Sequence, residues 1–144
     1  MSPSIIIGSD HAGFELKEKI RTHLTAEGYT VEDAGSFNET SVNYVDHAKI
    51  VARAVSEGRF SKGILVCGSG IGMSMAANRF KGVRAALCSD LLSARLSRQH
   101  NDANVLALGG RLIGDVLALE LVNVFLETEF EAGRHQDRIQ SMDF

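Results

Sequence analysis

The 144-residue sequence has little of several features that define particular protein classes. Two cysteines are too few for a disulfide-held secreted domain, and no signal-peptide pattern is present, so we expect a reducing compartment, most simply the cytoplasm. No apolar run approaches the roughly 18 to 20 residues that cross a bilayer. The formal net charge of -3 disfavours bulk electrostatic binding of nucleic acid. We therefore expect neither a membrane protein nor a nucleic-acid-binding protein.

Proline is nearly absent, whereas glycine is abundant. The single proline is Pro3, and the fourteen glycines are not gathered into a low-complexity run. Glycine is therefore expected where the backbone needs its conformational freedom and not in a flexible linker. Because 44% of the residues are hydrophobic and the composition is uniform, we predict a single domain over residues 1–144.

Short apolar runs alternate with longer segments of helical period, which is typical of βαβ units. We predict a Rossmann-like, doubly wound α/β domain in which a five-stranded parallel sheet lies between helices, an α/β/α sandwich. In the first helix Leu16 and Ile20 face the core and Lys17 faces outward. The strands are predicted at residues 4–8, 30–31, 62–67, 83–88 and 104–108, and the helices at residues 14–26, 44–57, 91–99 and 113–126, with another ending at residue 78.

The tail at residues 130–144 is polar, with little apolar periodicity. We expect it to extend outward and contact a partner subunit. Arg134 and Arg138 are spaced i and i+4, so a helical tail would present both guanidinium groups on one face, where they could clamp a phosphate. A solvated basic face is the alternative.

A glycine-rich turn, residues 68–72, follows the clearest strand and opens a helix. Its free N–H groups suit an anion, either a phosphate or the oxygen of an enediolate. Met73 stands where a dinucleotide fingerprint needs its third glycine, and no Walker pattern exists. Asp90 lies about 20 residues beyond Gly70, near the position of the acidic residue that binds ribose in nucleotide-binding folds. A nucleotide-binding regulatory module therefore remains an alternative function.

Several side chains at the expected strand ends can carry chemistry. Cys67 precedes the turn, where N–H dipoles favour a thiolate base or nucleophile; the alternative is a small buried hydrophobe, which is our interpretation of Cys88. Asp10 and His11 could bind a sugar or phosphate, or cap a helix. His100 suits proton transfer near neutral pH, or complements a helix dipole. No zinc-type spacing of His or Cys is present, so no metal site is predicted.

Four segments resemble the signature blocks of the type B ribose-5-phosphate isomerases, which share a superfamily with the galactose-6-phosphate isomerase subunits. The blocks are residues 8–17, 67–78, 96–105 and 133–138, in order over nearly the whole chain. The resemblance implies interconversion of D-ribose 5-phosphate and D-ribulose 5-phosphate through a cis-enediolate, without metal or organic cofactor. It also implies a homodimer or a tetramer of dimers with active sites at the interface. Related proteins act on allose, galactose or tetrose phosphates, which remain alternative substrates.

The resemblance also implies a role for individual residues. Cys67 moves a proton between C2 and C1, and Ser69 helps to move a proton between the two oxygens. His100 and Asp10 assist opening of the furanose ring. One departure from the family pattern is Val45, where proline commonly follows the tyrosine. The residues expected to bind the sugar or its phosphate, some of them from the neighbouring subunit, are His11, Tyr44, Gly68, Gly70, Ile71, Gly72, Met73, Ser74, Asn101, Arg111, Arg134 and Arg138.

Overall fold

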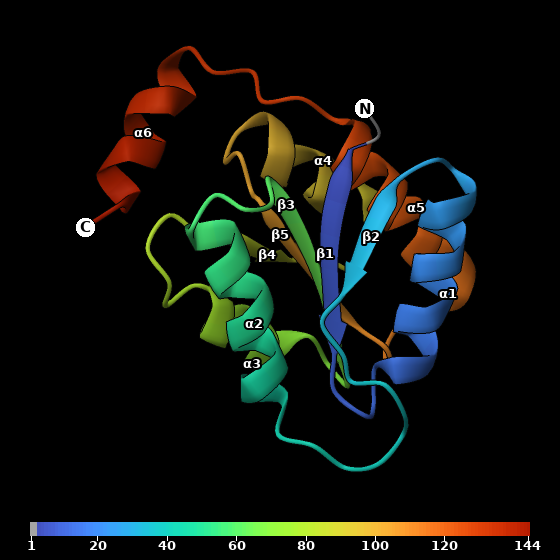
Figure 1. Cartoon of the computed structure of the whole chain (residues 1–144). Helices are drawn as coiled ribbons and strands as arrows, with labels where there is room; N and C mark the ends of the chain where they lie inside the picture. Colours follow the sequence, from blue (N-terminus) through green and yellow to red (C-terminus); the bar gives the residue numbers. More distant parts are fainter. Residues whose placement is uncertain (1–2) are drawn as a thin grey trace.

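The computed structural model describes residues 3–144, which form a five-stranded sheet with helices on both faces (Figure 1). All strand pairs are parallel, and the strand order is β2-β1-β3-β5-β4. The predicted doubly wound α/β fold is therefore confirmed. In chain order the elements are β1 (Ser4–Ser9), α1 (Phe14–Ala26), β2 (Thr30–Asp33), α2 (Tyr44–Ser56), β3 (Lys62–Cys67), α3 (Ile71–Ala77), β4 (Ala85–Leu87), α4 (Leu91–Gln99), β5 (Val105–Gly109), α5 (Asp115–Glu127) and α6 (Arg134–Met142).

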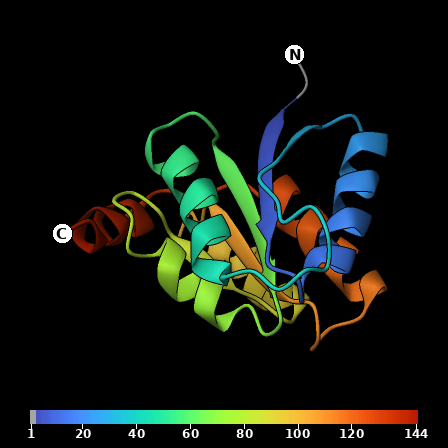
Figure 2. The ribbon, with the colours of Figure 1, turned by 60° about the horizontal axis from the view of Figure 1, so that its bottom comes forward.

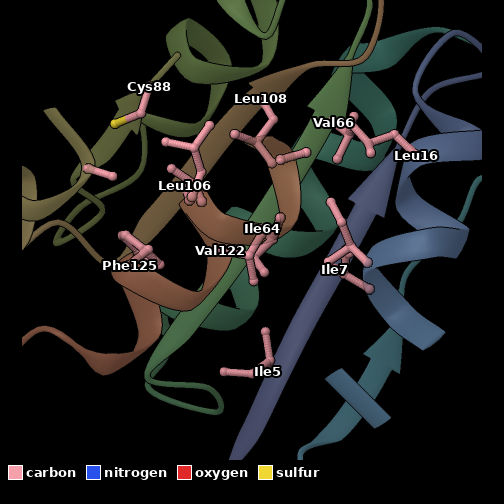
Figure 3. Packing of buried hydrophobic residues seen from close by; sticks show 14 of the residues in the cluster. Ile5, Ile7, Leu16, Ile64, Val66, Cys88, Leu106, Leu108, Val122 and Phe125 are labelled. Atoms are coloured by element: carbon pink, nitrogen blue, oxygen red, sulfur yellow. The ribbon is translucent and has the colours of Figure 1, made fainter. Parts of the chain in front are cut away.

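The core has two layers, one on each face of the sheet. Strand residues alternate between them: Ile64 and Val66 of β3 face the layer formed with α1, α4 and α5, and Leu65 faces α2 and α3. Figure 3 shows the first layer, with Phe125 of α5 packed against the strands. Burial on both faces explains why β1 and β3 have unbroken apolar runs in the sequence.

Strand β4 is shorter than predicted. It covers Ala85–Leu87 and pairs only with β5, at the edge of the sheet. Two asparagine side chains serve the backbone at its start: the Arg84 N–H donates to Asn104 Oδ1 at 2.7 Å and the Ala85 N–H donates to Asn78 Oδ1 at 2.7 Å. At the start of this edge strand, the two asparagine side chains thus accept backbone N–H groups that a neighbouring strand would otherwise bond.

The C-terminal tail forms a helix, α6, with a narrow apolar face. His135 and Ile139, spaced i and i+4, are buried, a periodicity that our reading of the tail as polar missed. Before the helix, the Glu131 N–H donates to the Gln99 carbonyl at 3.0 Å. Most of α6 is exposed, and in Figure 1 it stands apart from the sheet at the left, while the connection from α5 passes the end of the sheet where β1 begins. Among residues 3–144, no helix has the length and hydropathy needed to cross a membrane.

Candidate active site

The carboxyl ends of the parallel strands meet at one edge of the sheet, here called the carboxyl edge. β1 ends at Ser9, β3 at Cys67 and β5 at Gly109. The connections that follow these strands come forward in the lower part of Figure 2. The opposite edge, where the strands begin, is called the amino edge. The sequence-predicted site residues divide between these two edges.

Cys67 is the last residue of β3, and the residue is only 5% exposed. The Gly70 N–H donates to Cys67 Sγ at 3.1 Å, so a backbone donor points directly at the sulfur. Gly70 has a φ of +80°, and a Cβ there would lie 2.9 Å from the backbone carbon of Leu108. The donor to the sulfur therefore depends on a position that only glycine occupies without strain.

The start of α3 supplies further polar groups beside Cys67. The Ser69 hydroxyl oxygen accepts the Ile71 N–H at 3.2 Å, so the hydroxyl proton can point elsewhere. Gly72 and Met73 lie in the first helical turn, where N–H groups have no acceptor within the helix. The Ser74 N–H, by contrast, donates to the Gly70 carbonyl at 3.1 Å, so it is not available to bind an anion.

Tyr44, the first residue of α2, packs against the glycine turn. A Cβ on Gly72 would lie 2.7 Å from Cζ of the Tyr44 ring, so the ring needs glycine there. Asn43 caps α2, and its Oδ1 accepts the Val45 N–H at 3.0 Å. Proline cannot donate this bond. Val45 thus adds a capping interaction at the point where the sequence departs from the family pattern.

Asp10 and His11 follow β1 at the same edge. Asp10 is buried, and its Oδ1 accepts the Gly13 N–H at 2.9 Å, which holds the turn before α1. His11 Nδ1 accepts the Val42 N–H at 3.2 Å. The proton of a neutral His11 ring must therefore be on Nε2, which makes that nitrogen a hydrogen-bond donor.

Arg111 follows β5 and completes the carboxyl-edge group. Its N–H donates to the Gly68 carbonyl at 3.0 Å, and its side chain passes 3.5 Å from the position of a Cβ on Gly68. The structure thus brings a guanidinium group beside the turn that contains Cys67. The sequence-predicted residues at this edge are Asp10, His11, Tyr44, Cys67, Gly68, Ser69, Gly70, Ile71, Gly72, Met73, Ser74 and Arg111.

His100, Asn101, Arg134 and Arg138 lie at the amino edge. Helix α4 starts after the carboxyl end of β4 and runs back, so His100 lies near the start of β5. Helix α6 lies there too, and the rings of His100 and His135 stack with centroids 4.3 Å apart. Within one chain these residues are separated from Cys67 by the length of the sheet (Figure 1).

Asp90, which supported the nucleotide-binding alternative, and Cys88, interpreted as a small buried hydrophobe, both have structural roles. Asp90 caps α4: its Oδ1 accepts the Ser93 N–H and its Oδ2 accepts the Ser93 hydroxyl, each at 2.7 Å. These bonds lower the pKa of Asp90. Burial raises the pKa of the Cys88 thiol to about 11, so this cysteine is a neutral core residue at pH 7.

Lys17, predicted on the outer face of α1, is instead buried, so that prediction is wrong. Lys17 is 0% exposed, and its Nζ contacts Asp33 Oδ1 at 2.6 Å and Oδ2 at 2.8 Å. Asp33 Oδ1 also accepts the Gly35 N–H at 2.9 Å, so the pair holds the start of the loop that leads to Val42 and Tyr44. Helical spacing was the available signal, because Lys17 lies three residues before Ile20 on the buried stripe.

Comparison with known proteins identifies the class to which this fold and site belong. The sequence matches the Ribose/Galactose Isomerase family over residues 5–142, and the chain belongs to this family. It is 47% identical to ribose-5-phosphate isomerase B of Escherichia coli (strain K12) over 138 residues, which are 96% of this chain and 93% of that protein. It is 42% identical over 143 residues to D-erythrulose-4-phosphate isomerase of Pectobacterium atrosepticum, covering 98% and 93% of the two chains. The crystal structure of a ribose 5-phosphate isomerase from Thermotoga maritima superposes with a TM-score of 0.96 at 51% identity, covering 99% of each chain.

Proposed function

We propose that the chain is an aldose–ketose isomerase that interconverts D-ribose 5-phosphate and D-ribulose 5-phosphate. The observation that carries the proposal is the Cys67 sulfur, which accepts the Gly70 N–H at the carboxyl edge with Arg111 beside the same turn. A carbon base, donors for an oxyanion and a phosphate anchor are what this reaction needs. The relative that isomerises D-erythrulose 4-phosphate makes a tetrose phosphate the alternative substrate.

The chemical step is a proton transfer between neighbouring carbons. The Cys67 thiolate removes the proton from C2 of the open-chain aldose, the electron pair forms the C1–C2 double bond of an enediolate, and the thiol returns the proton to C1. Ser69 moves a proton between O2 and O1, since its oxygen accepts the Ile71 N–H and leaves its own proton available. The amides of Gly72 and Met73 stabilise the developing oxygen charge.

The phosphate is bound by cationic and N–H donors. His11 Nε2–H and the Arg111 guanidinium supply donors from one chain, because Val42 holds the His11 tautomer. Arg134 and Arg138 are exposed on α6 at the amino edge, so they serve a site only in another chain. Binding the phosphate away from the reacting carbons orients C1 and C2 at Cys67.

The active unit in this proposal is a homodimer, alone or within a tetramer of dimers. The amino edge of one chain brings His100, Asn101 and α6 to the carboxyl edge of its partner. Exposed apolar side chains next to the site support a contact there: Ile71 and Met75 lie i and i+4 on α3, and Leu87 is exposed nearby. Residues 130–144 then form part of the interface, as the tail was expected to do.

The proposed compartment is the cytoplasm. Cys67 and Cys88 are both free thiols, which suits a reducing environment. A base that works as a thiolate also requires that Cys67 remain unoxidised.

A substrate panel tests the proposed reaction. Purified protein is assayed with ribose 5-phosphate, erythrose 4-phosphate, allose 6-phosphate and galactose 6-phosphate, and its binding of ATP and NAD is measured by calorimetry. We expect the largest kcat/KM with ribose 5-phosphate and no nucleotide binding. A much larger kcat/KM with a tetrose or hexose phosphate would change the named substrate. Nucleotide binding without isomerisation would instead support a regulatory module.

A further inference from the structure

His100 is in contact with two side chains that the mechanism above does not use. The His135 ring stacks on the His100 ring with centroids 4.3 Å apart and planes 14° from parallel. Glu131 Oε1 lies 3.8 Å from His100 Nε2 and 4.0 Å from His135 Nε2. The three residues come from the end of α4, the connection before α6, and α6 itself.

The two rings differ in exposure in a way that suits different roles. The His135 side chain is 11% exposed and faces its own domain with Ile139, whereas the His100 side chain is 41% exposed. Desolvation lowers the pKa of His135, with further lowering by His100, Arg134 and Arg138 that outweighs the opposite effect of Glu131. The lowered pKa of His135 disfavours a positive charge on the ring that stacks against His100.

His100 needs such support because of its place in the chain. It is the residue that caps the C-terminus of α4, outside the last helical turn. A side chain at a helix end samples several rotamers, and a catalytic group must be held close to its working geometry. The stacked ring restricts the plane of His100, and the carboxylate places a charge beside its Nε2 edge.

We propose that His135 and Glu131 are positioning residues that hold the His100 imidazole in the orientation from which it opens the furanose ring of a sugar bound by the partner chain. The inference rests on the proposed function. In ring opening the C1–O4 bond breaks, O4 gains a proton, and the proton of O1 is lost as the C1 carbonyl forms. The correctly oriented imidazole transfers a proton in this step. It takes no part in the proton transfer between C2 and C1 that Cys67 carries out.

The two directions of the reaction separate ring opening from the carbon chemistry. Ribose 5-phosphate is mostly a furanose and must open before C2 can lose its proton. Ribulose 5-phosphate has its O5 blocked by phosphate and cannot close a five-membered ring, so it reaches Cys67 already open. Exchange of its C1 hydrogen with solvent therefore reports the carbon base without the ring-opening group.

The experiment compares His135→Ala, His135→Phe and Glu131→Gln with Gln136→Ala, a matched control on the exposed side of α6. Turnover of ribose 5-phosphate and deuterium uptake at C1 of ribulose 5-phosphate in D2O are measured for each dimer. We expect His135→Ala to lower kcat for ribose 5-phosphate by about tenfold or more, within the range of general acid–base contributions. Deuterium uptake should remain within about twofold of wild type, because proton transfer at carbon does not use the imidazole.

The variants also distinguish positioning from general structure. His135→Phe keeps a flat ring and should recover most of the lost turnover, Glu131→Gln should show the same selective loss as His135→Ala, and Gln136→Ala should resemble wild type. Equal losses in turnover and deuterium uptake, or no loss in either, would overturn the positioning role. If wild-type protein neither converted ribose 5-phosphate to ribulose 5-phosphate nor exchanged the C1 hydrogen of ribulose 5-phosphate, the proposed function itself would be wrong and the positioning role would be lost with it.

Discussion

The two cysteines of this chain have opposite surroundings at the residue scale. Cys88 lies in a core layer, where burial raises its thiol pKa to about 11. Cys67 lies at a strand end with an N–H donor on its sulfur. Residue type alone does not separate them; the strand end and the glycine turn after Cys67 do.

We expect Cys67→Ala to abolish isomerisation while Cys88→Ala leaves it intact. Loss of a carbon base should lower kcat by about a hundredfold to ten-thousandfold. Cys88→Ala removes one buried atom and should cost about 1 kcal/mol of unfolding free energy. For both variants, kcat is measured by steady-state kinetics and the free energy of unfolding by urea denaturation. Full turnover by the Cys67 variant would remove its assignment as the base.

Lys17 and Lys19, on the same helix, allow a second comparison. Lys17→Met leaves Asp33 without its buried partner and should lower the unfolding free energy by about 2 to 4 kcal/mol, allowing for the partial exposure of Asp33. It should also raise KM, because Asp33 anchors the loop that carries Val42. Lys19, which pairs with Asp115 on the surface, is the control, and Lys19→Met should change stability less. Equal effects in urea unfolding would contradict a special role for Lys17.

At the scale of elements, much of the fold could be predicted because the central strands β1, β3 and β5 are buried on both faces and each long helix has an apolar stripe. Helix α4, at Leu91–Gln99, was predicted with its observed bounds. The start of β4 could not be predicted in this way, since the side chains of Asn78 and Asn104 bond the backbone there and such contacts are non-local. In α6 only His135 and Ile139 form the apolar face, too few to stand out in a polar tail.

The turn between β3 and α3 gives an element-scale prediction. Gly70 and Gly28 both have left-handed φ values, +80° and +96°, but a Cβ meets the Leu108 backbone only at Gly70. Gly28→Ala should cost about 1 to 2 kcal/mol from backbone strain alone. Gly70→Ala adds a clash and should cost more, with a large loss of kcat because the N–H moves off the Cys67 sulfur. Unfolding and kinetics of the two variants test this, and equal stability losses would argue against the clash.

At the scale of the whole molecule, the residues of the proposed site lie at two opposite edges of the sheet. The sequence motifs predicted that Cys67 and His100 act in the same isomerisation. The family resemblance implied that some of the phosphate-binding residues come from a neighbouring chain. Their separation follows from topology, because a helix after a parallel strand must return to the amino edge. Motif content by itself could not assign each residue to an edge.

Mixing two defective variants tests the divided site. Cys67→Ala and His100→Asn each damage both sites of their own homodimer, but a mixed dimer contains one site with both residues intact. Random reassortment should restore about a quarter of wild-type activity, since about half of the dimers are mixed and each has one intact site. The measurement is turnover of ribose 5-phosphate after the mixture is dissociated and reassembled. No recovery in verified mixed dimers would mean that each site belongs to a single chain.

The position of α6 and His100 at the amino edge also has a genetic consequence. In the proposed homodimer, a chain altered only at that edge would still contribute an intact carboxyl edge to the site that it forms with a normal partner, so a single lesion would act as a partial, recessive defect. A chain altered at both edges would silence both sites of every pair that it enters. Co-expressed with a normal allele, such a double variant would be dominant-negative. The remaining isomerase activity would fall as the expression of the variant rises relative to the normal chain.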